Sequence, residues 1–106
     1  MIFEILFDAA NHDELILVDG GMCHYHLRKD GQVTIREIIV LKDRQRKGVG
    51  TAIVDSLKRL SGATSIFAKC PSELPANKWY PAIGFVSEGV NLTKNGKELS
   101  LWRLPL

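Results

Sequence analysis

The stretch Val33–Gly50, VTIREIIVLKDRQRKGVG, holds a strand pattern, then a polar loop, then the start of a helical pattern. Val33–Leu41 is rich in β-branched residues on both faces, which predicts a central strand that is covered from both sides. Beyond the loop, apolar side chains recur at helical spacing, at Val49, Ala52, Ile53, Leu57 and Leu60. The stretch therefore predicts a central strand that leads through a short loop into an amphipathic helix, with Gly62 as its end.

The rest of the chain predicts further strands and one short helix around this unit. Asp30-Gly31 and Asn95-Gly96 lie at the centres of two predicted turns, and Asp-Gly is a strong hairpin signal. The predicted strands are Met1–Phe7, Glu14–Asp19, Met22–Arg28, Thr64–Cys70, Phe85–Val90 and Leu99–Leu104, and the short helix is Asn77–Ile83. This order predicts a single α/β (α+β) domain, residues 1–106, with a mixed sheet and helices on its faces.

Length and composition restrict the class of protein. The 106 residues have room for one compact domain, and the hydrophobic share of 45% is ordinary for a soluble protein. No apolar stretch is long enough to cross a bilayer, and no secretory signal pattern opens the chain, which predicts a cytoplasmic protein without a membrane partner. Cys23 and Cys70 stand apart and predict reduced thiols. We expect no metal site, because His24 and His26 would share one strand face as a solvated or acceptor-facing pair.

The loop Gln45–Gly50, QRKGVG, is a candidate phosphate site. A helix N-terminus offers unpaired N–H groups and a positive dipole end, and glycines at 48 and 50 allow the backbone to come close to a ligand. Arg44, Arg46 and Lys47 add positive charge. The pattern lacks the Gly-Lys-Ser/Thr ending of a P-loop and the third glycine of a dinucleotide fingerprint. By itself it is compatible with a phosphate site or a plain turn; nucleic-acid binding is disfavoured, because the glycines account for the basic cluster better.

Two motifs together resemble one known superfamily. Glu37–Gly50, EIIVLKDRQRKGVG, closely resembles the strand and Gln/Arg-x-x-Gly-x-Gly/Ala loop that hold the CoA pyrophosphate in GNAT acyltransferases. Asn77–Phe85, NKWYPAIGF, resembles the Asn-x-x-Tyr-x-x-x-Gly-Phe stretch beside the thiol end of CoA. The resemblance implies a GNAT-like, mostly antiparallel sheet and acetyl-CoA as co-substrate of an N-acetyltransferase. The acceptor would be a primary amine, in a small molecule or a lysine side chain.

Carried over residue by residue, the resemblance implies a role for each matching position. Tyr80 would be the general acid for the departing thiolate, and Asn77 would hydrogen-bond the pantetheine. The backbone of the central strand would pair with the pantetheine arm, and the loop amides would hold the pyrophosphate. The implied cofactor-binding residues are Ile38, Ile39, Val40, Gln45, Arg46, Lys47, Gly48, Val49, Gly50 and Asn77.

Glu37 is the candidate general base. A carboxylate in an otherwise apolar strand is costly unless it has a partner or a task, and here it would take a proton from an ammonium acceptor. The alternatives are an ion pair across the sheet or a position that faces water. For Tyr80 the alternative is a core aromatic next to Trp79 and Phe85, followed by Pro81, which a helix tolerates only within its first turn.

Two features of the N-terminal region bear on the acceptor. Full GNAT domains carry two helices between their first two strands, and Asp8–Asp13 leaves no room for both. We therefore expect an open acceptor site or a homodimer that covers it. The first 27 residues contain five acidic residues and no Lys or Arg, which points to a cationic acceptor. The alternative to an enzyme is a non-catalytic acyl-CoA-binding sensor or assembly subunit, which needs neither Glu37 nor Tyr80.

Overall fold

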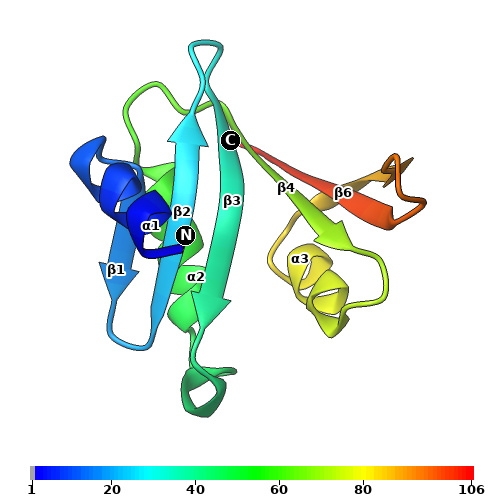
Figure 1. The fold of residues 1–106 in the computed structure, drawn as a ribbon, viewed down its shortest axis with the longest axis horizontal. Helices are drawn as coiled ribbons and strands as arrows, with labels where there is room; N and C mark the ends of the chain where they lie inside the picture. Colours follow the sequence, from blue (N-terminus) through cyan, green and yellow to red (C-terminus); the bar gives the residue numbers. More distant parts are fainter. Residues whose placement is uncertain (1) are drawn as a thin grey trace.

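The computed structural model describes residues 2–106, which form one six-stranded sheet with helices on both faces (Figure 1). In chain order the elements are α1 (Ile2–Asn11), β1 (Leu15–Val18), β2 (Gly21–Leu27), β3 (Gln32–Val40), the 3-10 helix η1 (Lys42–Arg44), α2 (Val49–Lys58), β4 (Ser65–Pro71), the 3-10 helix η2 (Pro75–Lys78), α3 (Trp79–Ala82), β5 (Val86–Leu92) and β6 (Glu98–Pro105).

The strand order is β1-β2-β3-β4-β6-β5, and only the β3–β4 pair is parallel. This parallel pair is joined by α2, because parallel neighbours need a crossover rather than a tight turn. The β2–β3 hairpin turns at Asp30-Gly31, where Gly31 has φ +93° and the Asp30 carboxylate accepts a hydrogen bond from the Gln32 N–H at 3.0 Å. The predicted mixed, mostly antiparallel sheet is confirmed.

The hydrophobic core lies between the sheet and α2. Ile53 and Leu57 of α2 are fully buried against Val33 and Ile66, which come from the two central parallel strands. These residues follow the predicted helical and strand periodicities, so the pattern of apolar side chains accounts for the packing. We call this side of the sheet the α2 face. Helix α1 covers β1 and β2 on the opposite side, the α1 face (Figure 1).

The N-terminal strand predicted at Met1–Phe7 is wrong, because residues 2–11 form α1; Met1 lies outside the described residues. Apolar residues at positions 2, 3, 5, 6, 7 and 9 satisfy both a loose alternation and a helical period. The helical period prevails because it brings Leu6 and the buried Ala9 to the sheet, while Phe3 and Phe7, one turn apart, stack at 6.2 Å.

The short helix also begins later than predicted. Asn77 belongs to η2, and α3 starts at Trp79, so Pro81 falls in the first turn of α3. A proline is tolerated there because the N–H it lacks has no partner within the helix. The later start removes the conflict that a helix from Asn77 would have with Pro81.

Candidate functional site

A cleft of about 1000 Å³ opens on the α2 face, between the end of β3, the start of α2, and α3. It brings together the two sequence segments that carried the resemblance, although they lie more than 25 residues apart in the chain. Of the predicted residues, the first segment contributes Ile38, Val40, Gln45, Arg46, Gly48, Val49 and Gly50, and the second contributes Tyr80. Glu37, Ile39, Lys47 and Asn77 do not line it.

The cleft exists because β3 and β4 separate. Their parallel pairing covers only Gln32–Ile35 and Ser65–Ala68, so the later part of β3 has no strand neighbour on that edge (Figure 1). The Leu41 N–H donates to the Gly20 carbonyl on the β2 side, and backbone groups alternate sides along a strand. The N–H and C=O of Ile38 and Val40 therefore point to the open edge, whereas those of Ile39 point to β2.

The loop before α2 has a backbone that suits an anion. Gly48, the N-cap, has φ +83°, and Arg46 has φ +64°, so both residues adopt the left-handed region. No side chain caps the helix, which leaves the N–H groups of its first turn without a partner in α2. Such a concave run of N–H groups at a positive dipole end is a ready site for phosphate.

The basic side chains of the loop divide into two kinds. Arg44 is neutralised by Asp19 at 2.8 Å, and it ties the loop to the β1–β2 turn. Arg46 and Lys47 form no ion pair with any residue in the range 2–106. Of these two free charges, that of Arg46 lines the cleft together with the loop, and this donor set fits a pyrophosphate.

Charge reversal at Arg46 is expected to weaken CoA binding several-fold at low ionic strength. The effect should shrink as salt is added, because exposed charges are screened over about 8 Å at physiological ionic strength. Calorimetric titration of CoA into Arg46→Glu at two salt concentrations measures it. Lys94→Glu, which makes the same charge change in the exposed β5–β6 turn, serves as the control. Equal losses in both variants would indicate a net-charge effect rather than a phosphate contact.

Tyr80 reaches the cleft from an aromatic cluster. Its side chain is only 4% exposed and contacts the rings of Trp79, Phe85 and Trp102 at centroid distances of 5.1, 5.2 and 5.9 Å. Burial raises the pKa of Tyr80 to about 12. Its hydroxyl has no hydrogen-bond partner among the described residues. Every fully buried polar side-chain atom of these residues does have a partner, so the Tyr80 hydroxyl is not fully buried. The hydroxyl is therefore open to the cleft that Tyr80 lines.

Close packing against this aromatic cluster requires a glycine at position 50. A Cβ at Gly50 would lie 2.9 Å from the Trp79 ring, so α2 and α3 come together at this glycine. At Gly48, by contrast, a Cβ would meet nothing within 4 Å. The two glycines of the motif therefore have different physical roles. Gly50 allows α2 and α3 to pack closely, and Gly48 allows a left-handed backbone at the mouth of the cleft.

The Asn77 side chain forms hydrogen bonds with other groups of the protein. Its amide nitrogen donates to the carbonyls of Pro71, Leu74 and Ser72 at 2.8, 2.9 and 3.3 Å. Its amide oxygen accepts a hydrogen bond from the Trp102 Nε1–H at 3.0 Å. The side chain holds the loop after β4 against β6. This geometry does not support the predicted contact between Asn77 and pantetheine.

Glu37 lies on the α1 face, away from the cleft lining. Its register partner is His24, while Cys23 pairs with Ile38 on the other face. Between these positions the pairing moves from His24↔Glu37 to Tyr25↔Ile35, so Arg36 is an extra residue in β3, a β-bulge. Glu37 is exposed and forms no ion pair with a described residue. The two predicted alternatives to a catalytic Glu37 were an ion pair across the sheet and a position that faces water. The geometry excludes the ion pair and agrees with a carboxylate that faces water.

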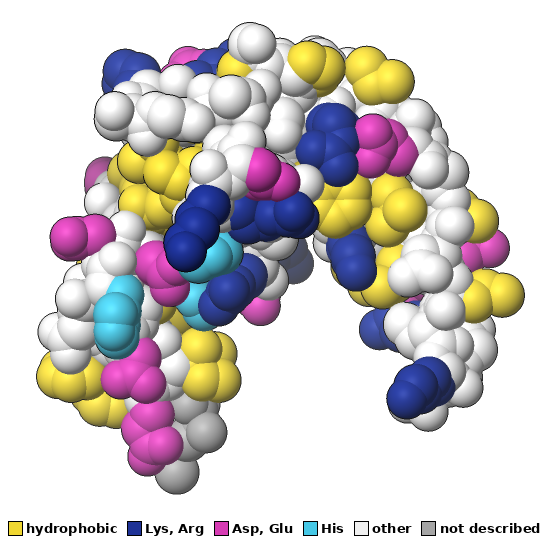
Figure 2. Space-filling model, turned by 90° about the horizontal axis from the view of Figure 1, so that it is seen from above, with side chains coloured by type: hydrophobic (Ala, Val, Ile, Leu, Met, Phe, Trp, Pro, Cys, Tyr) yellow, Lys and Arg dark blue, Asp and Glu magenta, His cyan; other side chains and the backbone are white. Residues whose placement is uncertain are grey.

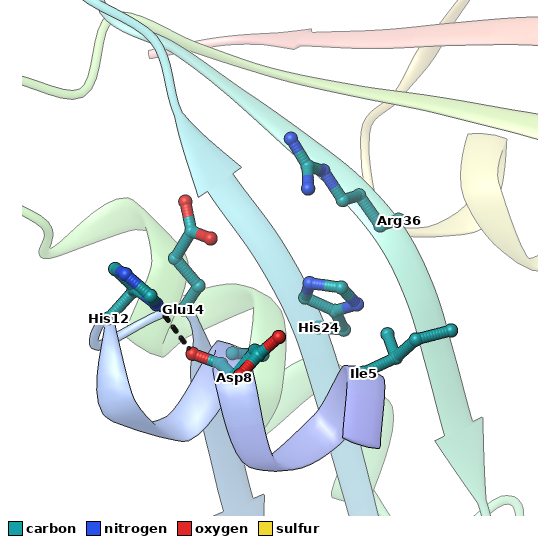
Figure 3. Close-up of a pocket in the computed structure, with 7 residues that line it drawn as sticks. Ile5, Asp8, His12, Glu14, His24 and Arg36 are labelled. Carbon is teal, nitrogen blue, oxygen red and sulfur yellow. Dashed lines mark hydrogen bonds between the residues drawn. The ribbon is translucent and has the colours of Figure 1, made fainter. Parts of the chain in front are cut away.

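A second pocket, which the sequence motifs do not contain, lies on the α1 face. It is lined by polar side chains from α1, β2 and β3 together with the segment that joins α1 to β1: Asp8, His12, Glu14, His24 and Arg36 (Figure 3). The one sequence signal for it was the prediction that His24 and His26 share a face. Residues 2–106 contain no group of three potential metal ligands. None of their helices has the length and apolar content to cross a membrane.

Comparison with known proteins decides the family. A family model described as the acetyltransferase (GNAT) domain matches residues 4–87, most of the chain. The protein belongs to the GNAT family. No curated protein matches its sequence. The match confirms the resemblance of the two motifs, and GNAT acetyltransferases use the fold described above.

Solved acetyltransferase structures share this fold at low sequence identity. Nourseothricin acetyltransferase is 20% identical with a TM-score of 0.71, over 81% of this chain and 57% of its own. A protein described as a streptothricin acetyltransferase from Bacillus anthracis, in complex with acetyl-CoA, is 19% identical with a TM-score of 0.73, over 82% and 56%. An aminoglycoside 6'-N-acetyltransferase complexed with CoA is 16% identical with a TM-score of 0.76, over 96% and 78%. The chain thus spans little more than half the length of the first two.

Proposed function

We propose that this GNAT protein transfers an acetyl group from acetyl-CoA to a primary amine. One observation carries the proposal: a single cleft combines the open edge of β3, the unpaired N–H groups at the start of α2, and the Tyr80 hydroxyl. The loop amides and the free charges of Arg46 and Lys47 would hold the pyrophosphate. The backbone of Ile38 and Val40 would pair with pantetheine, which brings the thioester towards Tyr80.

The reaction is a direct attack. The amine nitrogen attacks the thioester carbonyl carbon, the N–C bond forms, and the C–S bond breaks with its electron pair leaving on sulfur. Glu37 takes the proton that the ammonium must lose first, directly or through water. The nitrogen sheds a further proton after the attack, and solvent carries this proton to the thiolate.

The raised pKa of Tyr80 refines its expected role. At a pKa of about 12, the phenol is a weaker acid than a thiol such as that of cysteine, whose pKa is about 8.5. Complete proton transfer from Tyr80 to the thiolate is therefore unfavourable. We propose that Tyr80 keeps its proton and donates a hydrogen bond to the charge that develops on sulfur, as a donor that its aromatic neighbours hold in place.

A non-catalytic acyl-CoA-binding module is the second candidate. The tight packing of Tyr80 between Phe85 and Trp102 is what a purely structural tyrosine would also have. Such a module would use the same cleft, and it would need neither a base on the α1 face nor a hydroxyl beside the sulfur.

An acceptor panel separates the two candidates. The protein is incubated with acetyl-CoA and with polyamines, aminoglycosides, amino acids and lysine peptides, and both the free CoA thiol and the acetylated product are measured. We expect one acceptor class to give product in equal amount to released CoA. If calorimetry shows that acetyl-CoA binds while no acceptor is acetylated, the binding module replaces the enzyme.

A further inference from the structure

The pocket on the α1 face has about 220 Å³, enough for a small molecule, and it lies across the sheet from the CoA cleft. Seen from above, this face is the inside of an arch in which charged and histidine side chains gather (Figure 2). The close-up shows His24 and Arg36 on adjacent strands, with Asp8 and Glu14 on the side of α1 (Figure 3).

The negative groups of the pocket are partly satisfied. Glu14 is hydrogen-bonded to His26, and this bond is the main reason that the pKa of Glu14 lies below its ordinary value. His12 Nδ1 donates to the backbone carbonyl of Asp8 at 2.7 Å rather than to its carboxylate. The Asp8 carboxylate forms no ion pair among residues 2–106. Outside the pocket, Asp19 is paired with Arg44. The acidic N-terminal segment is therefore expected to attract polycations less strongly than its composition indicates.

Two arginines on this face of the sheet have contrasting surroundings. Arg103 is fully engaged: it pairs with Glu88 at 2.8 Å, donates to Gln32 and Ser65 at 3.1 and 3.2 Å, and lies over the Phe67 ring. Arg36 lines the pocket and forms no hydrogen bond through its guanidinium and no ion pair with any described residue, although its charge helps to lower the pKa of Glu14 in the same pocket. Arg103 is a structural residue, and Arg36 presents a free planar donor.

Arg36 also occupies a special place in the sheet. It is the extra residue of the β3 bulge, and it directly follows Ile35, the last residue of β3 that pairs with β4. The bulge puts Arg36 and the adjacent Glu37 on the α1 face at the point where the two strands separate. A ligand held by Arg36 on the α1 face would thus lie near this separation. From there its amine could reach the thioester of a CoA molecule bound on the α2 face.

We infer that Arg36 binds a carboxylate of the acceptor, so that the acceptor is an α-amino acid or a similar molecule with a carboxylate next to its amine. This inference rests on the proposed acetyl transfer and names its substrate class. A guanidinium holds a carboxylate through two parallel N–H···O bonds, which also fixes the orientation of the neighbouring amine. The free Asp8 carboxylate at the other end of the pocket favours an amino acid with a polar or basic side chain.

The test measures binding rather than activity. Each of the twenty common L-amino acids and its α-carboxamide is titrated, by calorimetry or NMR, into the full chain saturated with CoA. We expect at least one amino acid to bind, its carboxamide to bind at least tenfold more weakly, and Arg36→Gln to weaken the acid at least tenfold while hardly changing the carboxamide. Arg59→Gln, at the exposed end of α2, is the matched control, and thermal melting checks that both variants fold.

Three results would overturn the inference: no amino acid binds, acid and carboxamide bind equally, or Arg36→Gln binds the acid as tightly as the unchanged chain. Failure of the proposed function is seen separately in the acceptor panel, which measures the acetylated product and the released CoA. A protein that binds CoA and acetylates amines without preferring a carboxylate keeps the proposed function and loses only the role of Arg36.

Discussion

Tyr80→Phe is expected to lower kcat for acetyl transfer by about a hundredfold or more, with little change in the affinity for acetyl-CoA. The substitution keeps the ring and its contacts with Phe85 and Trp102, and it removes the donor that would stabilise the departing thiolate. Loss of a positioned acid or hydrogen-bond donor typically costs about 10² or more in rate. Steady-state kinetics with a saturating acceptor, together with calorimetry of acetyl-CoA, measure both effects.

The control for this variant is Tyr25→Phe, because the chain offers a second buried tyrosine. The Tyr25 hydroxyl donates to the Asp13 carbonyl at 2.6 Å, and Tyr25 does not line the cleft on the α2 face. Its removal should reduce the free energy of unfolding by about 1 kcal/mol and leave kcat nearly unchanged. Unchanged turnover in Tyr80→Phe, or an equal loss in both variants, would contradict a catalytic hydroxyl.

Gly48→Val is expected to lower the affinity for CoA at least tenfold while the protein still folds. The new side chain would enter open space at the mouth of the cleft, where the pyrophosphate must approach the loop amides. Because Gly48 has φ +83°, the variant also pays a left-handed backbone penalty of about 1–2 kcal/mol. Calorimetric titration of CoA, with thermal unfolding in parallel, separates the loss of binding from the loss of stability.

Gly62→Val is the matched control for this strain. Gly62 has φ +87°, a Cβ there would also meet nothing within 4 Å, and it lies beyond the opposite end of α2. Both variants should lose similar stability, and only Gly48→Val should lose CoA affinity. If both bind CoA like the unchanged chain, the loop is a plain turn. Gly50→Val is unsuitable for this test, because it would collide with Trp79 and disturb the packing of α2 on α3.

The central part of the fold was determined by local sequence patterns. The β-branched run at Val33–Leu41 and the helical spacing after Gly48 each favour one secondary structure, and the structure contains β3 and α2 there. The geometry that would suit a phosphate in the loop between them is local, since Gly48 adopts φ +83° readily and a helix start always leaves N–H groups unpaired. For this reason the conformation of the loop, and the family of the protein, could be predicted from short stretches of consecutive residues.

Other features were decided only by tertiary packing. The apolar residues at the N-terminus fit a strand or a helix, and contact with β1 and β2 selects α1. Asn77 matches a motif position, yet the surrounding loop carbonyls and Trp102 occupy its amide. No sequence period reveals the bulge at Arg36, because it depends on the pairing of β3 with β2. That pairing, and the separation of β3 from β4, distribute the two pockets over opposite faces of the sheet. Residues distant in the chain meet there only because the whole sheet is assembled.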